Sequence, residues 1–440
     1  MTALLMAAGY VTTASAKQWT LKECIDYALT NNISLAKSNL TKKSAQEDLL
    51  QAKANLLPSL NLGTNQSVGY RPWTNAGVAT VSNGTVSSSV NKTYYNGSYS
   101  LNANWTVWNG NKNRNNIKVS ELAKQTAELD SATTANSIQE QIVQLYVQIL
   151  YTGEAITVNK ESLEKSRTNE KRGKEMVEIG KMSKADYAQL TAQTAQDEYN
   201  VVEAQSQLAK YKTQLKQLLE ITEDDFDVTT PQASDDVALS TIPSLMSVYE
   251  AALTTRPEIA ASQLAIKSSD VNLAIAKAGK MPTISLTGGV ATSTNSMSDK
   301  TWGNQIKTNF DANVGASLSV PLFDNRSTKT AVNKAKIQQE ESLLNLKDKQ
   351  KELYATIEGY WIDAQTNQQK FRSAQTNVES QEASYELLSE QFKLGLKNIV
   401  ELMNGKTNLL SAQQSKLQAK YMTILDQQLL KFYQGEPINL

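Results

Sequence analysis

Residues 310–326, FDANVGASLSVPLFDNR, contain the pattern from which the fold of this chain can be predicted. From Phe310 to Val320 apolar side chains alternate with polar ones, which predicts a β-strand with one apolar face and one polar face. Beyond Pro321 there is no further proline until Pro437, and the apolar residues recur at intervals of three and four. This spacing predicts an unusually long helix. A strand therefore continues directly into a long helix.

The same join occurs once more, earlier in the chain. Residues 97–108 alternate in the same way, and after Asn109-Gly110-Asn111 a second run without proline extends from Lys112 to about Met176. At about 1.5 Å per residue, sixty-odd helical residues reach on the order of 100 Å. Each long run ends at a turn that contains glycine, and a shorter helix is predicted to run back from it.

These two joins belong to an internal duplication. Pro282 repeats Pro58 ahead of a hairpin, and Gly395 repeats Gly180 at a helix-tip turn. Such agreement at equivalent places is typical of a duplicated chain. Each repeat is predicted as a helix, a β-hairpin and a long helical hairpin. The predicted divisions are repeat 1 at 17–223 with its hairpin at 58–108, a linker at 224–243, and repeat 2 at 244–436 with its hairpin at 282–321, both repeats forming one barrel–tunnel unit.

Composition excludes several function classes. The 440 residues have a net charge of zero, so there is no electrostatic argument for a nucleic-acid partner. Histidine is absent and no glycine-rich phosphate loop occurs. We therefore predict no catalytic residue, no cofactor and no metal site, and the chain is not expected to be an enzyme. The paired carboxylates Asp224-Asp225 and Asp235-Asp236 lie in the linker and are interpreted as solvated charge.

The N-terminal residues resemble a secretory signal. Residues 4–8 form a short apolar core, and Ala14-Ser15-Ala16 fits a small-residue cleavage site, so 1–16 is interpreted as a signal peptide remnant. Its expected basic leading region is missing, which leaves open whether the N-terminus is complete. The single cysteine, Cys24, is expected at a buried helix position. No apolar run long enough for a spanning helix follows the N-terminus.

The two hairpins supply four strands of the length that a tilted strand needs to cross a bilayer. A loop rich in Ser, Thr, Asn and Gly is predicted at about 71–95 between the first two. Open sheet edges are costly in hydrocarbon, and four strands are too few to close a barrel, so several copies are expected to share one. A half-buried sheet of an ordinary protein would alternate identically, but helices this long cannot be covered by the sheet. An aromatic girdle is predicted at Tyr70, Trp73, Trp105, Trp108 and Trp302.

Five segments carry a family resemblance: LKECIDYALTNN (21–32), LLPSL (56–60), RPEI (256–259), AGKMP (278–282) and SVPLFDNR (319–326). In their order and duplication they resemble the TolC-like outer-membrane efflux family over nearly the whole chain. The resemblance implies a mainly α fold with a transmembrane β-barrel, in which a homotrimer builds a twelve-stranded barrel and an α-helical periplasmic tunnel. It also implies a periplasmic adaptor and an inner-membrane pump as partners, with the barrel in outer-membrane lipid.

The resemblance further implies a periplasmic gate at the helix tips. Its positions in this sequence are Asp186, Phe392, Lys397, Glu401 and Asn404. A ring of Glu401 carboxylates would favour cations in a narrow pore. Two residues depart from the family pattern: Phe392 has no hydroxyl to reach Asp186, and Asn404 leaves one carboxylate per chain. A solvent-facing charge on a helix remains the alternative for Glu401.

These observations predict a passive exit duct for efflux or type I secretion, driven by its pump. The alternative from another class is a soluble coiled-coil scaffold. The cargo, the adaptor and the choice between efflux and protein secretion are not encoded in recognisable motifs.

Overall fold

The structure is a computed structural model that describes residues 17–73, 78–82, 85–89, 92–222, 226–229 and 235–438. The predicted signal peptide at 1–16 lies outside them. The chain divides into two compact units, the first made of residues 1–41, 128–262 and 346–440 and the second of 42–127 and 263–345. Each unit contains segments of both predicted repeats.

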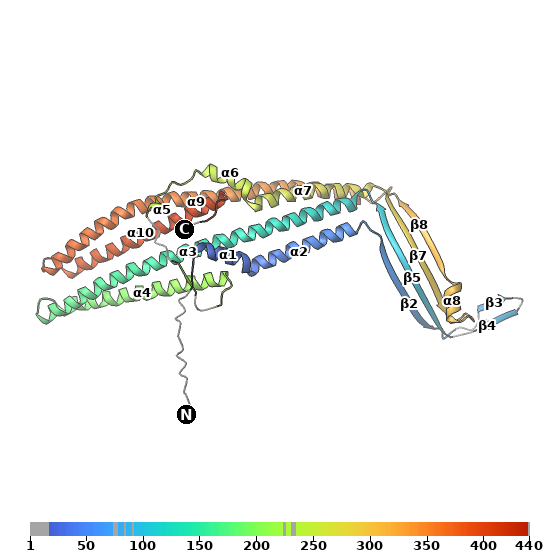
Figure 1. Cartoon of the computed structure of the whole chain (residues 1–440), viewed down its shortest axis with the longest axis horizontal. Coiled ribbons are helices and arrows are strands. Elements are labelled where there is room, and N and C mark those ends of the chain that lie inside the picture. The colour runs from blue at the N-terminus through green and yellow to red at the C-terminus, as the bar shows by residue number, and fades with distance from the viewer. Residues whose placement is uncertain are drawn as a thin grey trace, which may run out of the picture. The chain divides into compact units, whose positions relative to one another are not determined.

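Two long helical hairpins dominate the helical part of the chain (Figure 1). The first joins α3 (Lys112–Glu178) to α4 (Lys184–Leu218), and the second joins α9 (Ser327–Lys393) to α10 (Ile399–Tyr433). The long helices α3 and α9 each have 67 residues, and the returning helices α4 and α10 each have 35. The two proline-free runs therefore form helices as predicted. Among the described residues, no helix combines enough length and apolar character to cross a bilayer.

Shorter helices precede each hairpin: α1 (Leu21–Asn31), α2 (Ile33–Ala54), α6 (Leu245–Thr255), α7 (Pro257–Lys277) and the 3-10 turn Ala278–Lys280. Thr20 and Glu23 form a capping box at the start of α1. The break between α6 and α7 falls at Arg256, which is extended because Pro257 disfavours helical backbone in the residue before it.

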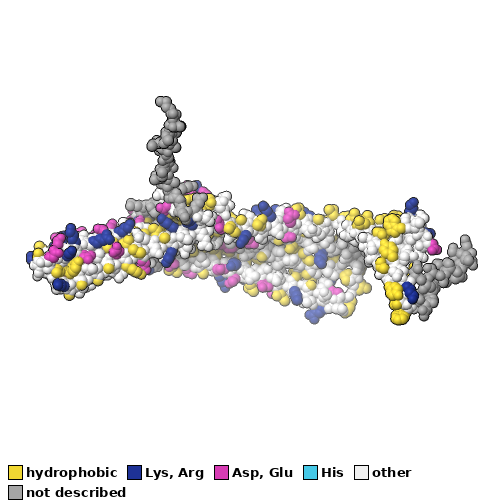
Figure 2. All heavy atoms as spheres, turned by 90° about the horizontal axis from the view of Figure 1, so that it is seen from below, with side chains coloured by type: hydrophobic (Ala, Val, Ile, Leu, Met, Phe, Trp, Pro, Cys, Tyr) yellow, Lys and Arg dark blue, Asp and Glu magenta, His cyan; other side chains and the backbone are white. Residues whose placement is uncertain are grey.

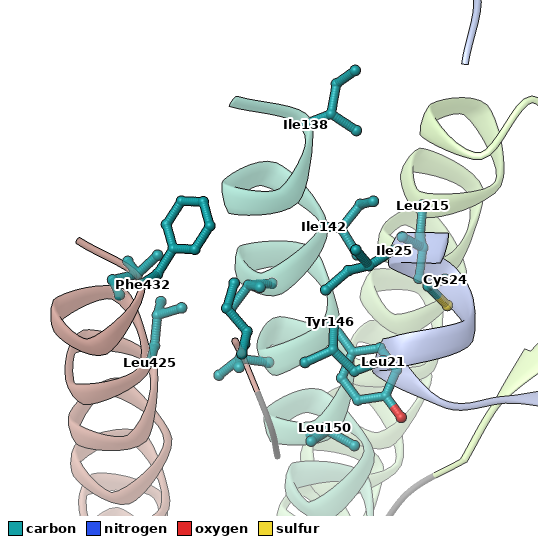
Figure 3. Close-up of a cluster of buried hydrophobic side chains, with 14 of the residues drawn as sticks. Leu21, Cys24, Ile25, Ile138, Ile142, Tyr146, Leu150, Leu215, Leu425 and Phe432 are labelled. Carbon is teal, nitrogen blue, oxygen red and sulfur yellow. The ribbon is translucent and has the colours of Figure 1, made fainter. Parts of the chain in front are cut away.

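The core of the first unit forms where α1 packs against the hairpins (Figure 3). Ile142 and Tyr146 of α3 are buried there, with Leu215 of α4. The Tyr146 hydroxyl donates a hydrogen bond to the carbonyl oxygen of Thr229 at 2.6 Å. Cys24 is fully buried in the same cluster, which confirms its predicted position.

The predicted linker at 224–243 contains short regular elements. Strand β6 (Phe226–Val228) pairs in parallel with β1 (Lys17–Trp19), and a short helix, α5 (Asp235–Ala238), follows. The reading of Asp235 as solvated charge is wrong, because its carboxylate lies 3.2 Å from the Nζ atoms of Lys416 and Lys420. Asp224 and Asp225 lie outside the described residues.

The second unit contains one four-stranded antiparallel sheet in the order β2-β5-β7-β8 (Figure 1). Its strands are β2 (Ser59–Tyr70), β5 (Thr93–Trp108), β7 (Thr283–Asn295) and β8 (Asp311–Ser319). The loop prediction at 71–95 is wrong in part, because β3 (Val78–Ser82) and β4 (Thr85–Ser89) pair there and β5 begins at Thr93. A short helix, α8 (Trp302–Thr308), precedes β8.

Both joins from sheet to long helix have the same construction. The Asn113 amide donates to Asn109 Oδ1 at 3.2 Å, and the Thr328 amide donates to Asp324 Oδ2 at 2.8 Å. These caps satisfy backbone donors at the starts of α3 and α9. The residues with positive φ at the two joins are Gly110, Asn111, Asn325 and Arg326.

Candidate functional site

The sheet presents one face that is apolar across all four strands. Leu62 of β2 lies opposite Leu101 of β5, which lies opposite Val290 of β7 and then Ala312 of β8. The side chain of Leu62 is 83% exposed and that of Val314 is 91% exposed. The described residues thus leave this face uncovered, and Figure 2 shows hydrophobic side chains gathered on it. An apolar surface of this kind marks contact with lipid or with protein.

Aromatic residues lie toward both ends of the same face. At the end that joins the helices, a β-bulge between Thr106 and Trp108 inserts one residue, so Trp105 and Trp108 oppose Leu286 and Ile284 on one face. At the other end Trp302 packs edge-on against Tyr99, with ring centroids 6.2 Å apart. Of the remaining predicted girdle residues, Tyr70 ends β2 and is exposed, and Trp73 is exposed just beyond it.

The sheet has two open edges. Strands β2 and β8 are its outermost strands, and within the described chain each pairs on one side only. Each therefore offers a row of backbone amides and carbonyls to another strand. The sheet thus has two unpaired edges and one exposed apolar face within the described chain.

The helix tips are built alike in the two hairpins. Gly180 has φ +72° and Gly395 has φ +74°. The amide that follows each glycine donates to a carbonyl five residues back, Lys181 to Met176 and Leu396 to Gln391, both at 2.8 Å. This is a Schellman turn, which places its C′ residue in the left-handed region that glycine adopts without strain.

The residues after each turn cap the returning helix. Ser183 caps α4 and accepts a hydrogen bond from the Asp186 amide at 3.0 Å. Asn398 and Glu401 form a capping box at the start of α10. Asp186 and Glu401 therefore occupy the same position, the third residue of a returning helix.

Glu401 also forms an ion pair with Lys397, with 2.6 Å between Oε1 and Nζ. The hydrogen bond that Lys397 donates to Glu401 in this pair holds the pKa of the Glu401 carboxyl below its ordinary value. The two predicted gate residues of opposite charge are thus brought together, with both side chains 39% exposed. Asn404 is exposed one turn further along α10, where residues three apart share a helix face.

Phe392 lies in a different environment from the other gate positions. Its ring is buried among Leu190 of α4, Tyr385 of α9, and Ile399 and Leu402 of α10. It joins the two hairpins near their tips. No hydrogen-bonding group is required at this position for that packing.

A family model described as "Outer membrane efflux protein" matches residues 24–220 and 248–436. The chain belongs to this family. The family consists of transport channels, so this protein is an outer-membrane efflux channel that serves as an exit duct. A soluble scaffold is not supported.

Relatives of this efflux channel cover most of its length at low identity. Outer membrane efflux protein BepC of Brucella suis biovar 1 is 19% identical over 423 residues, which are 96% of this chain and 87% of BepC. Toxin and drug export protein A of Aggregatibacter actinomycetemcomitans is 22% identical over 410 residues, 92% of this chain and 83% of that protein.

Solved structures share the fold. CusC, a protein whose crystal structures address folding and transmembrane channel formation, superposes with a TM-score of 0.81 at 17% identity, over 99% of this chain and 96% of CusC. The CmeC outer membrane channel of Campylobacter jejuni has a TM-score of 0.75 at 20% identity, over 94% of this chain and 86% of CmeC.

Sequence reasoning missed a buried charged cluster in this efflux channel. The Lys406 ammonium of α10 donates hydrogen bonds to Asp197 of α4 and to Ser166 of α3. Ser166 in turn donates to Asp197 at 2.5 Å, and Gln193 donates to the other carboxylate oxygen at 3.1 Å. Burial lowers the pKa of Lys406. The available indication was that Asp197 falls seven residues after Leu190, in line with the buried positions of its helix.

Proposed function

We propose that three copies of this chain close one twelve-stranded barrel in the outer membrane, and that their helices together form a periplasmic tunnel through which cargo passes passively. The observation that carries this proposal is the uncovered apolar face between two open sheet edges. In hydrocarbon each unpaired amide or carbonyl costs several kcal/mol, so the edges need partner strands. Four strands from each of three copies supply them.

The dimensions of the apolar face support a lipid contact. Ten residue steps separate Tyr95 from Trp105 on β5, which is about 33 Å along a strand. At a tilt of about 40° this length spans about 25 Å, the height of the apolar band of outer-membrane barrels. The predicted girdle fits the two limits of this band, with Tyr70, Trp73 and Trp302 toward the loops and Trp105 and Trp108 toward the helices.

The gate proposal rests on Glu401 and its ion pair with Lys397. In a trimer the three symmetry-related carboxylates would form a ring that attracts cations and repels anions. Breaking the pair with Lys397 would free the ring to change its charge and position. Asp186 would contribute the equivalent position of the first hairpin, and Asn404 a polar neighbour. Phe392 would hold the two hairpins together behind the gate.

The equal lengths of the paired helices and the repeated caps also support an origin by duplication, with repeats at 17–223 and 244–436 joined by 224–243. Both repeats would contribute to one barrel and one tunnel.

The energy is proposed to come from partners, an inner-membrane pump and a periplasmic adaptor. Names of relatives describe different cargoes: AprF of Pseudomonas aeruginosa is an alkaline protease secretion protein, and CusC of Escherichia coli belongs to a cation efflux system. One duct architecture that serves such different cargoes is consistent with selection by the pump.

Electron microscopy of detergent-purified protein tests the assembly. We expect a hollow cylinder with threefold symmetry, together with a trimer on gels that heat dissociates. A water-soluble monomer whose hairpins fold against its own helices would refute the proposal.

Planar-bilayer recordings test the gate. Glu401→Ala should raise the single-channel conductance or reduce cation block, because the ring loses its charge. Glu352→Ala is the matched control, since Glu352 forms a comparable exposed pair with Lys349 away from the tips. A current equal to that of the wild type would remove Glu401 from the gate.

A further inference from the structure

Cations gather where the sheet meets the helices. Within nine residues of the sheet, on the helix side of its four junctions, the basic residues are Lys53, Lys112, Arg114, Lys277, Lys280 and Arg326. The same four segments contain one acidic residue, Asp324, which caps α9. The whole chain has no net charge. The excess of positive charge is therefore confined to the junctions between the sheet and the helices.

All four junctions lie at one end of the sheet (Figure 1). The register places Ser59 opposite Asn104 and Thr283 opposite Ser319, so β2 and β7 begin where β5 and β8 end. The cations thus border the apolar face on the side of Trp105. In a bilayer this is the level of the phosphate groups, just outside the hydrocarbon.

A groove of about 430 Å³ opens within this cationic border. It lies between the start of α3 and the end of α7, and its charged lining residues are Arg114, Lys118 and Lys277. No carboxylate lines it. In the part of the chain that the structure describes, these three side chains form no ion pair.

The walls of the groove are held close together. A Cβ atom at Gly110 would lie 2.6 Å from the Met281 side chain, and Gly110 has φ +66°. Glycine is therefore required both by the backbone conformation and by the approach of the two segments. Met281 and Ala278 give the groove an apolar side next to its cations.

The cations at the start of α3 oppose the stability of that helix. Lys112 and Arg114 lie in the first turn of α3, and that turn contains no acidic residue. The helix macrodipole makes this end positive, so cations are unfavourable there. An anionic ligand would reverse that effect, because it meets both the side-chain charges and the dipole.

We propose that this groove binds the phosphate headgroup of an anionic phospholipid in the periplasmic leaflet of the outer membrane. The proposal rests on the proposed membrane position of the sheet. Arg114, Lys118 and Lys277 neutralise the phosphate, the side-chain amides of Asn111 and Asn115 donate to the headgroup, and the acyl chains continue over the apolar face. Three cations with two apolar neighbours suit a lipid better than a free anion.

Native mass spectrometry of the delipidated, assembled protein tests the site. The probe is dioleoylphosphatidylglycerol, compared with dioleoylphosphatidylcholine and with inorganic phosphate. We expect wild-type protein to bind the anionic lipid at least tenfold more tightly than the zwitterionic one. Neutralising Arg114→Gln, Lys118→Gln and Lys277→Gln together should weaken binding about fivefold per cation, or on the order of 100-fold in all.

A control with the same change of net charge is Lys171→Gln, Arg172→Gln and Lys174→Gln, near the tip of α3, and it should bind as the wild type does. Equal binding of both lipids, wild-type binding by the groove variant, or full displacement by equimolar inorganic phosphate would overturn the proposal.

Bilayer conductance distinguishes failure of the lipid site from failure of the proposed channel function. Normal channels without preferential lipid binding refute the lipid site alone, whereas wild-type protein that forms no channel refutes the proposed function.

Discussion

The buried pair of Lys406 and Asp197 allows the sharpest test of the packing between the two helical hairpins. Their side chains are 4% and 1% exposed. Removing one partner of a buried ion pair leaves an uncompensated charge, at a cost of about 3–5 kcal/mol. Ser166 and Gln193 would still donate to the Asp197 carboxylate, so we expect Lys406→Ala to cost about 3 kcal/mol, at the lower end of this range.

Hydrogen exchange measures this cost locally. A loss of about 3 kcal/mol corresponds to amides near residues 190–201 and 402–409 exchanging on the order of 100-fold faster. The double replacement Asp197→Leu with Lys406→Met should restore most of the protection, because no charge remains buried. Lys349→Ala removes an exposed pair and should change exchange little.

Two results would refute this reasoning. One is that the amides of the Lys406→Ala variant exchange no faster than those of the Lys349→Ala variant. This result would mean that water reaches Asp197 in the folded protein. The other is a double replacement as unstable as the single one, which would assign the effect to lost packing rather than to unpaired charge.

Three further predictions concern other parts of the chain. Burial raises the pKa of Asp426 to about 7, so the folded chain keeps a proton that the unfolded chain releases near pH 4. Stability should therefore fall as the pH rises from about 4 to about 7 and then level off, and Asp426→Asn should remove this slope in thermal melts. Gly395→Ala should cost about 1 kcal/mol because its φ is +74°, whereas Gly359→Ala, inside α9 with open space around it, should stabilise by about as much; melting temperatures compare the two. Leu62→Arg on the apolar face should cost about 2–4 kcal/mol in lipid, while Asn61→Arg on the polar face should cost far less, as read from the temperature at which the trimer dissociates on gels.

Much of the candidate site follows from position in the sequence. Gly180 and Gly395 could be assigned to turns because few other residues adopt left-handed backbone, and the ion pair of Lys397 with Glu401 follows from their spacing of four on a helix. The burial of Phe392 could not be predicted, because it depends on a residue of the other hairpin, Leu190.

Local sequence patterns specify most of the long elements and the faces that they bury. Alternation of side chains specifies a strand and its apolar side, and intervals of three and four specify a helix and its seam, because both periods come from local backbone geometry. The long helices, the four strands of the main sheet and its apolar face were accessible in this way, whereas β3, β4 and β6 were not.

Which faces contact one another is seen only in the folded chain. The pairing of β5 with β7, the bulge that turns Trp108 to the apolar face, and the contact of Lys406 with Asp197 join segments that are far apart in the chain or offset by one residue. The same is true of Asp235, whose two lysine partners lie on α10. Periodicity tells which side of an element is buried, but the partner depends on register and packing between distant segments, and no local pattern encodes these.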